Sequence, residues 1–139
     1  MIREYETDRP VPDYIISNLI ENAHRAPSAW HTQVQEFIMV KDHLTKSKLD
    51  DAVLGQSQVY DAAELISVCS NTSWSVARYG KRGRDFYSIV AGAFASILML
   101  LTSVSQGIIA ACFVGAFEDN KVSEVLNLSK HVKPIGIIH

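Results

Sequence analysis

Apolar residues recur along the chain at helical spacing in some stretches and in short continuous runs in others. The first stretch predicts an amphipathic helix, with Pro12 in its first turn and Pro27 just beyond its end. Its apolar positions fall on one helical face: Ile15, Ile16, Leu19, Ile20 and Ala23. The runs Phe37 to Val40 and Leu65 to Cys69 are short, apolar and contain β-branched residues, so they predict buried strands.

The rest of the chain continues this interleaving of helices and strands. The further elements predicted are a helix from Asp42 to about Leu54 that Gly55 ends, a strand from Ile108 to Val114, a helix from Asp119 or Asn120 through Leu126, and a strand from Pro134 to Ile138. We therefore expect an α+β fold of the α/β-type three-layer kind, with a small central β-sheet flanked by helices. Because no linker or repeat divides the sequence, residues 1–139 are expected to form a single domain.

A long segment without any charged residue runs from Ser88 to Phe117. Within it, Ile89 to Val104 predicts a helix that is apolar on several faces, and such a helix must be buried in protein or in lipid. Several hydroxyl residues, and Gly107 at a marginal length, argue against a membrane span. We favour a central helix covered by its own sheet on one side and by a second subunit on the other, because so short a chain can hardly bury it alone.

The region from Asn71 to Asp85 contains two glycines and four cationic residues. Its composition predicts a surface loop or a lid. The cations are Arg78, Lys81, Arg82 and Arg84. They either attract a phosphate group or simply lie in solvent.

Composition and charge exclude several classes of protein. An apolar fraction of 47% with 20% charged residues is typical of a globular domain, and a net charge of −2 makes nucleic acid an unsuitable partner. Cys69 and Cys112 lie in apolar runs and are interpreted as reduced core residues, with a disulfide or redox pair as the alternative. Since residues 1–6 have no signal-peptide pattern, we expect a cytoplasmic protein.

The usual motifs of side-chain catalysis and metal binding are missing from the sequence. It contains no phosphate-binding glycine loop, no nucleophile elbow and no metal-ligand spacing among its five histidines, so we expect no metal and no catalytic side chain. A bound cofactor would have to supply the chemistry. The segment from Ala26 to Gln33 is the best candidate for a ligand-binding loop, because it places polar groups beside Trp30; alternatively, it is an ordinary connection in which Trp30 fills the core.

Several short segments, taken in their order along the chain, match the pattern of a known family. They are Val11-Pro12-Asp13, Ala23 to Gln33, Glu36 to Val40, Gly55-Gln56 with Asp61-Ala62, Arg78-Tyr79-Gly80 through Arg84-Asp85, Cys112 to Phe117, and Val132 to Ile138. Together they resemble the FMN-dependent nitroreductase family nearly from end to end. The resemblance implies a nitroreductase-like fold, a homodimer with its cofactor sites between the subunits, and transfer of electrons from NAD(P)H through FMN to an electron-poor acceptor such as a nitroaromatic compound or a quinone.

The resemblance also implies which residues hold the flavin. Arg3 corresponds to a basic position near the pyrimidine edge of the ring, and Gln58, less surely Gln56, to positions that reach the same edge. Val114 and Gly115 correspond to a strand end that offers backbone groups to the ring. The loop that lines the ring and the ribityl chain corresponds to Pro27, Ser28, Ala29, His31 and Gln33. Trp30, Phe86 and Tyr87 are expected to form walls of the acceptor site.

The sequence departs from the family pattern in its phosphate-binding segments and in part of the loop. Members usually carry an Arg-x-Ser before the position of Ile2-Arg3 and a Gly-Tyr segment with a basic residue after the last strand, so the chain looks shortened at both ends. His31 stands where Asn is usual, and Val34-Gln35 replaces Pro-Trp. The alternative expectation is therefore a homodimer of the same fold that binds flavin weakly or not at all and acts as a binding protein.

Overall fold

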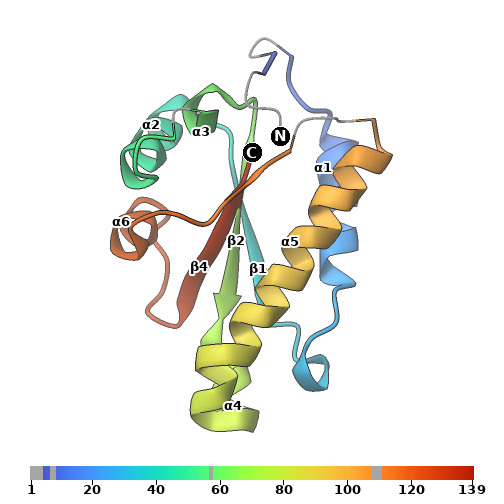
Figure 1. Ribbon diagram of the computed structural model, residues 1–139, viewed down its shortest axis with the longest axis vertical. Helices are drawn as coiled ribbons and strands as arrows, with labels where there is room; N and C mark the ends of the chain where they lie inside the picture. The colour runs from blue at the N-terminus through green and yellow to red at the C-terminus, as the bar shows by residue number, and fades with distance from the viewer. Residues whose placement is uncertain (1–4, 7–8, 57, 108–110) are drawn as a thin grey trace.

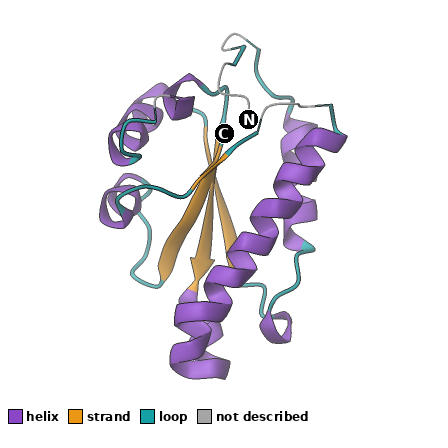
Figure 2. Cartoon of the chain, viewed as in Figure 1, coloured by secondary structure: helices purple, strands orange, loops and turns teal. Residues whose placement is uncertain are grey.

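A four-stranded antiparallel sheet forms the centre of the molecule, with helices on both of its faces (Figures 1 and 2). The computed structural model describes residues 5–6, 9–56, 58–107 and 111–139. The strands are β1 (Gln35–Val40), β2 (Leu65–Asn71), β3 (Phe113–Val114) and β4 (Val132–Ile138). They lie in the order β1-β2-β4-β3, so β2 and β4 are central and β1 and β3 form the edges.

Alternate residues of β2 point to opposite faces of the sheet and form two separate cores. Ile66 and Val68 face α1 (Asp13–His24) and α5 (Ser88–Ser105). Leu65 faces the other layer, made by α2 (His43–Ala52), α3 (Gln58–Asp61) and α6 (Asp119–Val125). These two layers and the sheet between them confirm the expected α+β architecture of three layers. Cys69 and Cys112 are both buried, and neither forms a disulfide with a described residue, as expected.

Local sequence explains the ends of the first two helices. Pro12 immediately precedes α1, and α1 ends at His24, before Pro27. At the start of α2 the Asp42 carboxylate accepts a hydrogen bond from the Thr45 amide at 2.8 Å. Gly55, with φ at +81°, follows this helix in the left-handed conformation that glycine favours.

The prediction of a loop or lid between Asn71 and Asp85 was wrong. This stretch forms α4 (Thr72–Arg82) and a π-helical turn (Gly83–Tyr87) that continues into α5. The Asn71 side chain accepts from the Ser73 amide at 3.3 Å and caps α4. Gly80 kinks the helix with φ of 56° and ψ of −137°, whereas Gly83 keeps helical angles and packs closely on Ser75. Gly80 therefore bends the helix instead of ending it, and Gly83 permits the close contact with Ser75.

The predicted strand from Ile108 to Val114 is shorter in the structure, where only Phe113–Val114 form β3. Residues 108–110 lie outside the described part of the chain. Cys112 and His139 still exchange two backbone hydrogen bonds, of 2.9 and 3.1 Å. This pairing holds the start of β3 against the end of β4.

Within the described residues, one helical stretch, Thr72–Ser105, has the length and apolar composition of a membrane span. The core helix of a soluble protein has the same properties. Its α5 portion packs against α1 and the sheet through small or flexible residues, namely Ala91, Gly92, Ala95, Ser96 and Met99. This arrangement is that of a core helix, as expected. The outward face of α5 is exposed in the single chain.

Candidate functional site

The loop between α1 and β1 has an unusual backbone. Trp30, His31 and Gln33 have φ of 54°, 55° and 45°, a left-handed conformation that non-glycine residues seldom adopt. Trp30 is 70% exposed, so the interpretation in which its ring fills the core was wrong. Several strained residues within one exposed loop are typical of functional sites.

Hydrogen bonds within the segment hold this backbone in place. The Ser28 hydroxyl oxygen accepts from the Gln33 amide at 2.9 Å, and the Thr32 hydroxyl donates to the Ala29 carbonyl at 3.0 Å. The Gln33 side chain donates to the carbonyl of His24 at 3.2 Å, tying the loop to the end of α1. The structure thus groups the five predicted loop residues in one ordered turn: Pro27, Ser28, Ala29, His31 and Gln33.

A hollow of about 560 Å³ opens beside this loop. Thr32 and Gln33 line it from the loop, Trp74 from α4, and Phe37 from β1. Its size lies within the range of small-molecule sites in proteins. The loop therefore borders a space that can hold part of a ligand.

A second group of predicted residues lies around the end of β3. Val114 is buried in the core between the sheet and the layer of α2, α3 and α6, whereas Gly115 is exposed. The Gln56 side chain donates to the carbonyl of Ala116 at 3.2 Å, so this glutamine is tied to the residue after Gly115. Gln58 begins α3, whose Val59 packs in the same core as Val114. Arg3, which was predicted to join this group, lies outside the described residues.

The two groups lie toward opposite ends of the sheet (Figure 1). The loop meets the sheet where the Asn71 amide donates to Val34, and Asn71 pairs with Val132 of β4. Val114, in contrast, pairs with Ile137 of the same strand. The stretch of β4 from residue 132 to residue 137 separates them by roughly 16 Å, at about 3.3 Å per residue. One chain therefore does not bring the two groups around one ring.

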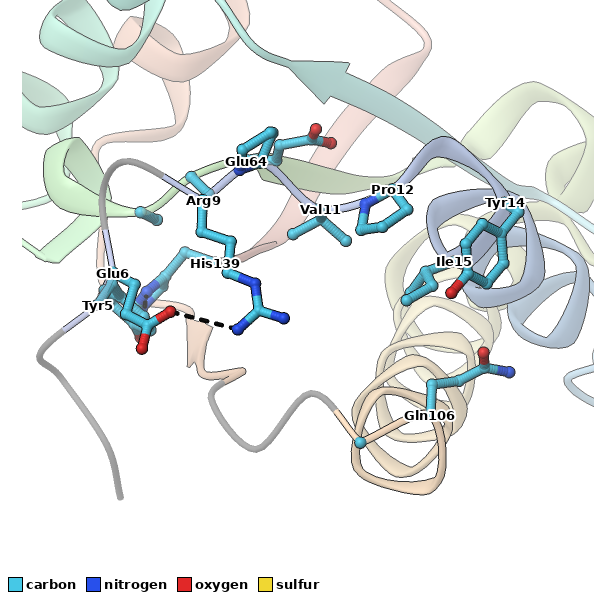
Figure 3. A pocket seen from close by; sticks show the side chains of 14 residues that line it. Tyr5, Glu6, Arg9, Val11, Pro12, Tyr14, Ile15, Glu64, Gln106 and His139 are labelled. Carbon is cyan, nitrogen blue, oxygen red and sulfur yellow. Dashed lines mark hydrogen bonds and ion pairs between the residues drawn. The ribbon is translucent and has the colours of Figure 1, made fainter.

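A further cleft of the described residues lies elsewhere (Figure 3). It has a volume of about 610 Å³ and is bordered by the chain before α1, by Glu64 and by the end of β4. Inside it Tyr5 and His139 share a hydrogen bond of 2.8 Å, and Arg9 forms a long ion pair of 3.6 Å with Glu6. None of the described residues that were predicted to hold a flavin lines this cleft.

Comparison with known proteins identifies the family. The sequence model of the nitroreductase family matches residues 1–75, more than half of the chain. The chain belongs to the nitroreductase family. The matched region includes α1, the strained loop, β1 and β2.

Two relatives illustrate how this nitroreductase-family chain compares with longer proteins. An NADH dehydrogenase from Thermus thermophilus is 43% identical over 65 residues, which are 47% of this chain and 31% of that protein. The structure of NfrA1 from B. megaterium is 27% identical with a TM-score of 0.85, covering 99% of this chain and 60% of that one. The matches span less than half the length of the curated relatives.

The fold itself extends to more distant proteins. The NADPH:FMN oxidoreductase from Vibrio harveyi, whose structure contains NAD⁺, superimposes with a TM-score of 0.87 at 19% identity. The match covers 99% of this chain and 62% of the other. This comparison shows a shared fold.

One contact near the site was not expected from the sequence. The guanidinium of Arg78 on α4 lies over the ring of Trp30, 4.1 Å from its centroid. The sequence placed Arg78 in a cationic cluster and in a segment that resembles the family, but gave it no partner. Because the two residues are far apart in the sequence and the region of Arg78 was predicted to be a loop, no local pattern indicated this pairing.

Proposed function

We propose that the chain is one subunit of a homodimeric oxidoreductase that uses FMN to pass electrons from NAD(P)H to an electron-poor acceptor, such as a nitroaromatic compound or a quinone. When bound, the flavin ring accepts a hydride and passes electrons on. Family membership, the names of the relatives and the fold shared with an NADPH:FMN oxidoreductase support this proposal.

The separation of the two groups of site residues is the observation that carries the proposal. A ring that contacts both the loop around Ser28 and the strand end at Gly115 needs them from different chains, because one chain holds them apart. In a twofold dimer the loop of each subunit can meet the strand end of its partner, which gives two equivalent sites.

The outward face of α5 offers the surface for such a dimer. Its exposed apolar residues, with exposed fractions of 44% to 63%, are Ile89, Phe94, Ile97, Leu101 and Val104. Most of them recur at intervals of three or four residues and so form one stripe along the helix. An apolar stripe of this length is typical of an interaction surface. We propose that two α5 helices meet there, in a soluble, cytoplasmic dimer.

The residues present suit a flat ring that becomes electron-rich on reduction. The exposed Gly115 permits close approach of the backbone, where a larger residue would add bulk. His31, exposed in the loop, offers a polar ring at the other half of the site. Trp30 and Phe86 have exposed aromatic side chains, and we expect them to form walls of the acceptor site.

A specific observation supports the second candidate function, a dimer that binds flavin weakly. The Ser28 oxygen and the Gln33 amide group already form hydrogen bonds within the loop and with α1. If those bonds persist when flavin is present, the Ser28 hydroxyl and the Gln33 amide form fewer hydrogen bonds with the flavin and add less to its binding. Titration of the purified protein with FMN separates the two candidates. Submicromolar binding of FMN, and bleaching of the bound flavin by NAD(P)H, are expected of the oxidoreductase and not of the weak binder.

Complementation between subunits tests the trans arrangement. Each proposed site has two halves, the loop around Ser28 from one subunit and the strand end at Gly115 from the other. His31→Asp places a negative charge in the loop half-site, and Gly115→Val blocks the strand-end half-site. We expect each variant alone to lose flavin binding and activity. Mixing them by unfolding and refolding together should restore one intact site in each heterodimer, which is about a quarter of the wild-type sites. Recovery fails if both half-sites act within one chain, and it fails equally if the protein binds no flavin.

A further inference from the structure

The contact between Trp30 and Arg78 combines an aromatic face and a cation at the edge of the proposed site. The Arg78 guanidinium lies 4.1 Å from the centroid of an indole that is itself 70% exposed. Within the described part of the chain, no carboxylate forms an ion pair with Arg78. Its charge and several of its N–H donors are therefore available to an anion.

Further cations follow on the same helix. Lys81 and Arg82 are exposed near the end of α4 and form no ion pair with a described carboxylate. The Arg82 guanidinium lies 4.8 Å from the ring centroid of Phe86, and its Nε donates to the Tyr87 hydroxyl at 3.2 Å. The next cation, Arg84, is neutralised by its bond of 2.7 Å to Asp85. α4 thus carries three positive charges, on Arg78, Lys81 and Arg82, that form no ion pair with a described carboxylate.

The backbone of the loop presents the indole to this surface. Trp30 adopts φ of 54° and ψ of 26°, and His31 follows with φ of 55°. An exposed contact between a cation and an aromatic ring is weak by itself, so it gives little reason to hold a tryptophan in this conformation. A ligand that uses both the indole face and the guanidinium provides that reason.

The chemistry that fits these groups is a planar base joined to phosphate. An exposed indole stacks on a heterocyclic base, and arginine binds phosphate oxygens through paired N–H donors. We infer that Trp30 and Arg78 bind the adenosine phosphate end of the electron donor, and that this donor is NADPH. The inference rests on the proposed function. NADPH carries one more phosphate group than NADH, so the surplus cations of α4 favour it.

Three electron donors separate phosphate recognition from reduction of the flavin. NADPH, NADH and N-benzyl dihydronicotinamide share the reducing ring, but the last has no adenosine and no phosphate. In the FMN-loaded dimer, Arg78→Met should lower kcat/KM for NADPH about tenfold, since it removes one charge-assisted phosphate contact. The loss for NADH should be smaller, and the benzyl donor should react within about twofold of wild type.

Two further variants control this measurement. Arg78→Lys retains the charge and should recover part of the rate with NADPH. Lys48→Met removes an exposed cation from α2, on the other face of the sheet, and should leave all three donors unaffected. Equal loss of rate with all three donors in Arg78→Met, or a wild-type preference for NADH, would overturn the inference.

Binding of NADP⁺ gives a readout that needs no turnover. Trp30 is one of two tryptophans, so NADP⁺ should quench the fluorescence of the wild-type protein, and Arg78→Met should raise the Kd about tenfold. Quenching that is unchanged in Arg78→Met, in a protein that is still reduced by the benzyl donor, refutes the inference and leaves the proposed function standing. Binding that depends on Arg78, in a protein that no donor reduces, refutes the proposed function instead.

Discussion

The ring of Phe113 in β3 lies against Gly136 in β4, in the space that a side chain on residue 136 would occupy. The same ring also lies close to Gly115, where an added Cβ would come within 3.1 Å of it. Phe113 pairs with Ile138 in the sheet, so its ring reaches diagonally across to the glycine. The Phe113 ring thus packs between Gly136 and the exposed strand end at Gly115.

Gly136→Ala should destabilise the protein by about 1–3 kcal/mol, because the new methyl group overlaps the ring of Phe113 and forces it to move. Urea denaturation monitored by circular dichroism measures the loss. FMN affinity should fall as well, since a displaced Phe113 no longer supports Gly115.

A double mutant identifies the cause of that loss. Phe113→Ala removes the ring, so adding Gly136→Ala to it should cost much less than Gly136→Ala costs in the wild type. If the two changes are additive, the clash with Phe113 is not responsible.

His31→Asn should stabilise the protein by about 0.5 kcal/mol. His31 has φ of 55°, and asparagine is among the non-glycine residues that tolerate the left-handed region best. The same change restores the residue usual in the family at this place. His43→Asn, at the helical start of α2, is the matched control and should give no gain. Thermal unfolding of the two variants decides, and an equal effect at both positions would contradict the explanation from backbone strain.

Much of the fold could be predicted because it follows from local patterns. Pro12 and Pro27 bracket α1, and Asp42 caps α2, so the sequence signals and the helix ends agree closely. The short apolar runs became β1 and β2, each extended by polar residues at one end. These elements need only hydrophobic spacing and capping to be recognised.

The region of α4 shows where local patterns fail. Gly80 and Gly83, with charged residues around them, predicted a loop, but packing on Ser75 and the cap from Asn71 favour a helix. Gly80 supplies the kink through its positive φ, which other residues seldom adopt. The two glycines correctly indicated a departure from regular helical backbone, which occurs at Gly80. They did not indicate that the helix continues beyond that point.

The candidate site was predictable residue by residue but not as an arrangement. Family resemblance indicated both the loop around Ser28 and the strand end at Gly115. Their separation depends on the register between β2 and β4, which pairs Asn71 with Val132 and is set by contacts between distant parts of the chain. The contact between Arg78 and Trp30 was unpredictable for the same reason.

Ile97→Lys should convert the proposed dimer into monomers. Ile97 is 49% exposed in the middle of the apolar stripe of α5, and a buried lysine without a partner is costly at an interface. Sedimentation velocity at micromolar concentration measures the change. Flavin binding should fall in parallel, because each site needs both subunits.

Leu44→Lys is the matched control for this prediction. Leu44 is 67% exposed on α2, in the opposite helical layer, so its substitution should leave the oligomeric state unchanged. A wild-type protein that sediments as a monomer would contradict both the interface on α5 and the shared flavin sites.

Lys46 is a buried cation that the sequence pattern of α2 did not reveal. Its side chain is 3% exposed, and its Nζ donates to the carbonyls of Ala62 at 2.8 Å and Ala63 at 2.5 Å. Burial lowers the pKa of Lys46 below its usual value of 10.5, although Glu64 and Asp42 favour the charged form. The folded protein therefore releases this proton more readily than the unfolded chain does.

The sign of the resulting pH dependence follows from proton linkage. Between the lowered pKa and 10.5 the unfolded chain binds more protons at Lys46, so stability rises with pH in this window. Lys46→Met lacks that contribution. The free energy of unfolding of the wild type, relative to Lys46→Met, should therefore increase as the pH is raised toward 10.5. Urea denaturation at several pH values measures the difference, and Leu44→Met controls for an uncharged change on the same helix. A difference that stays constant with pH would show that burial does not lower the pKa of Lys46.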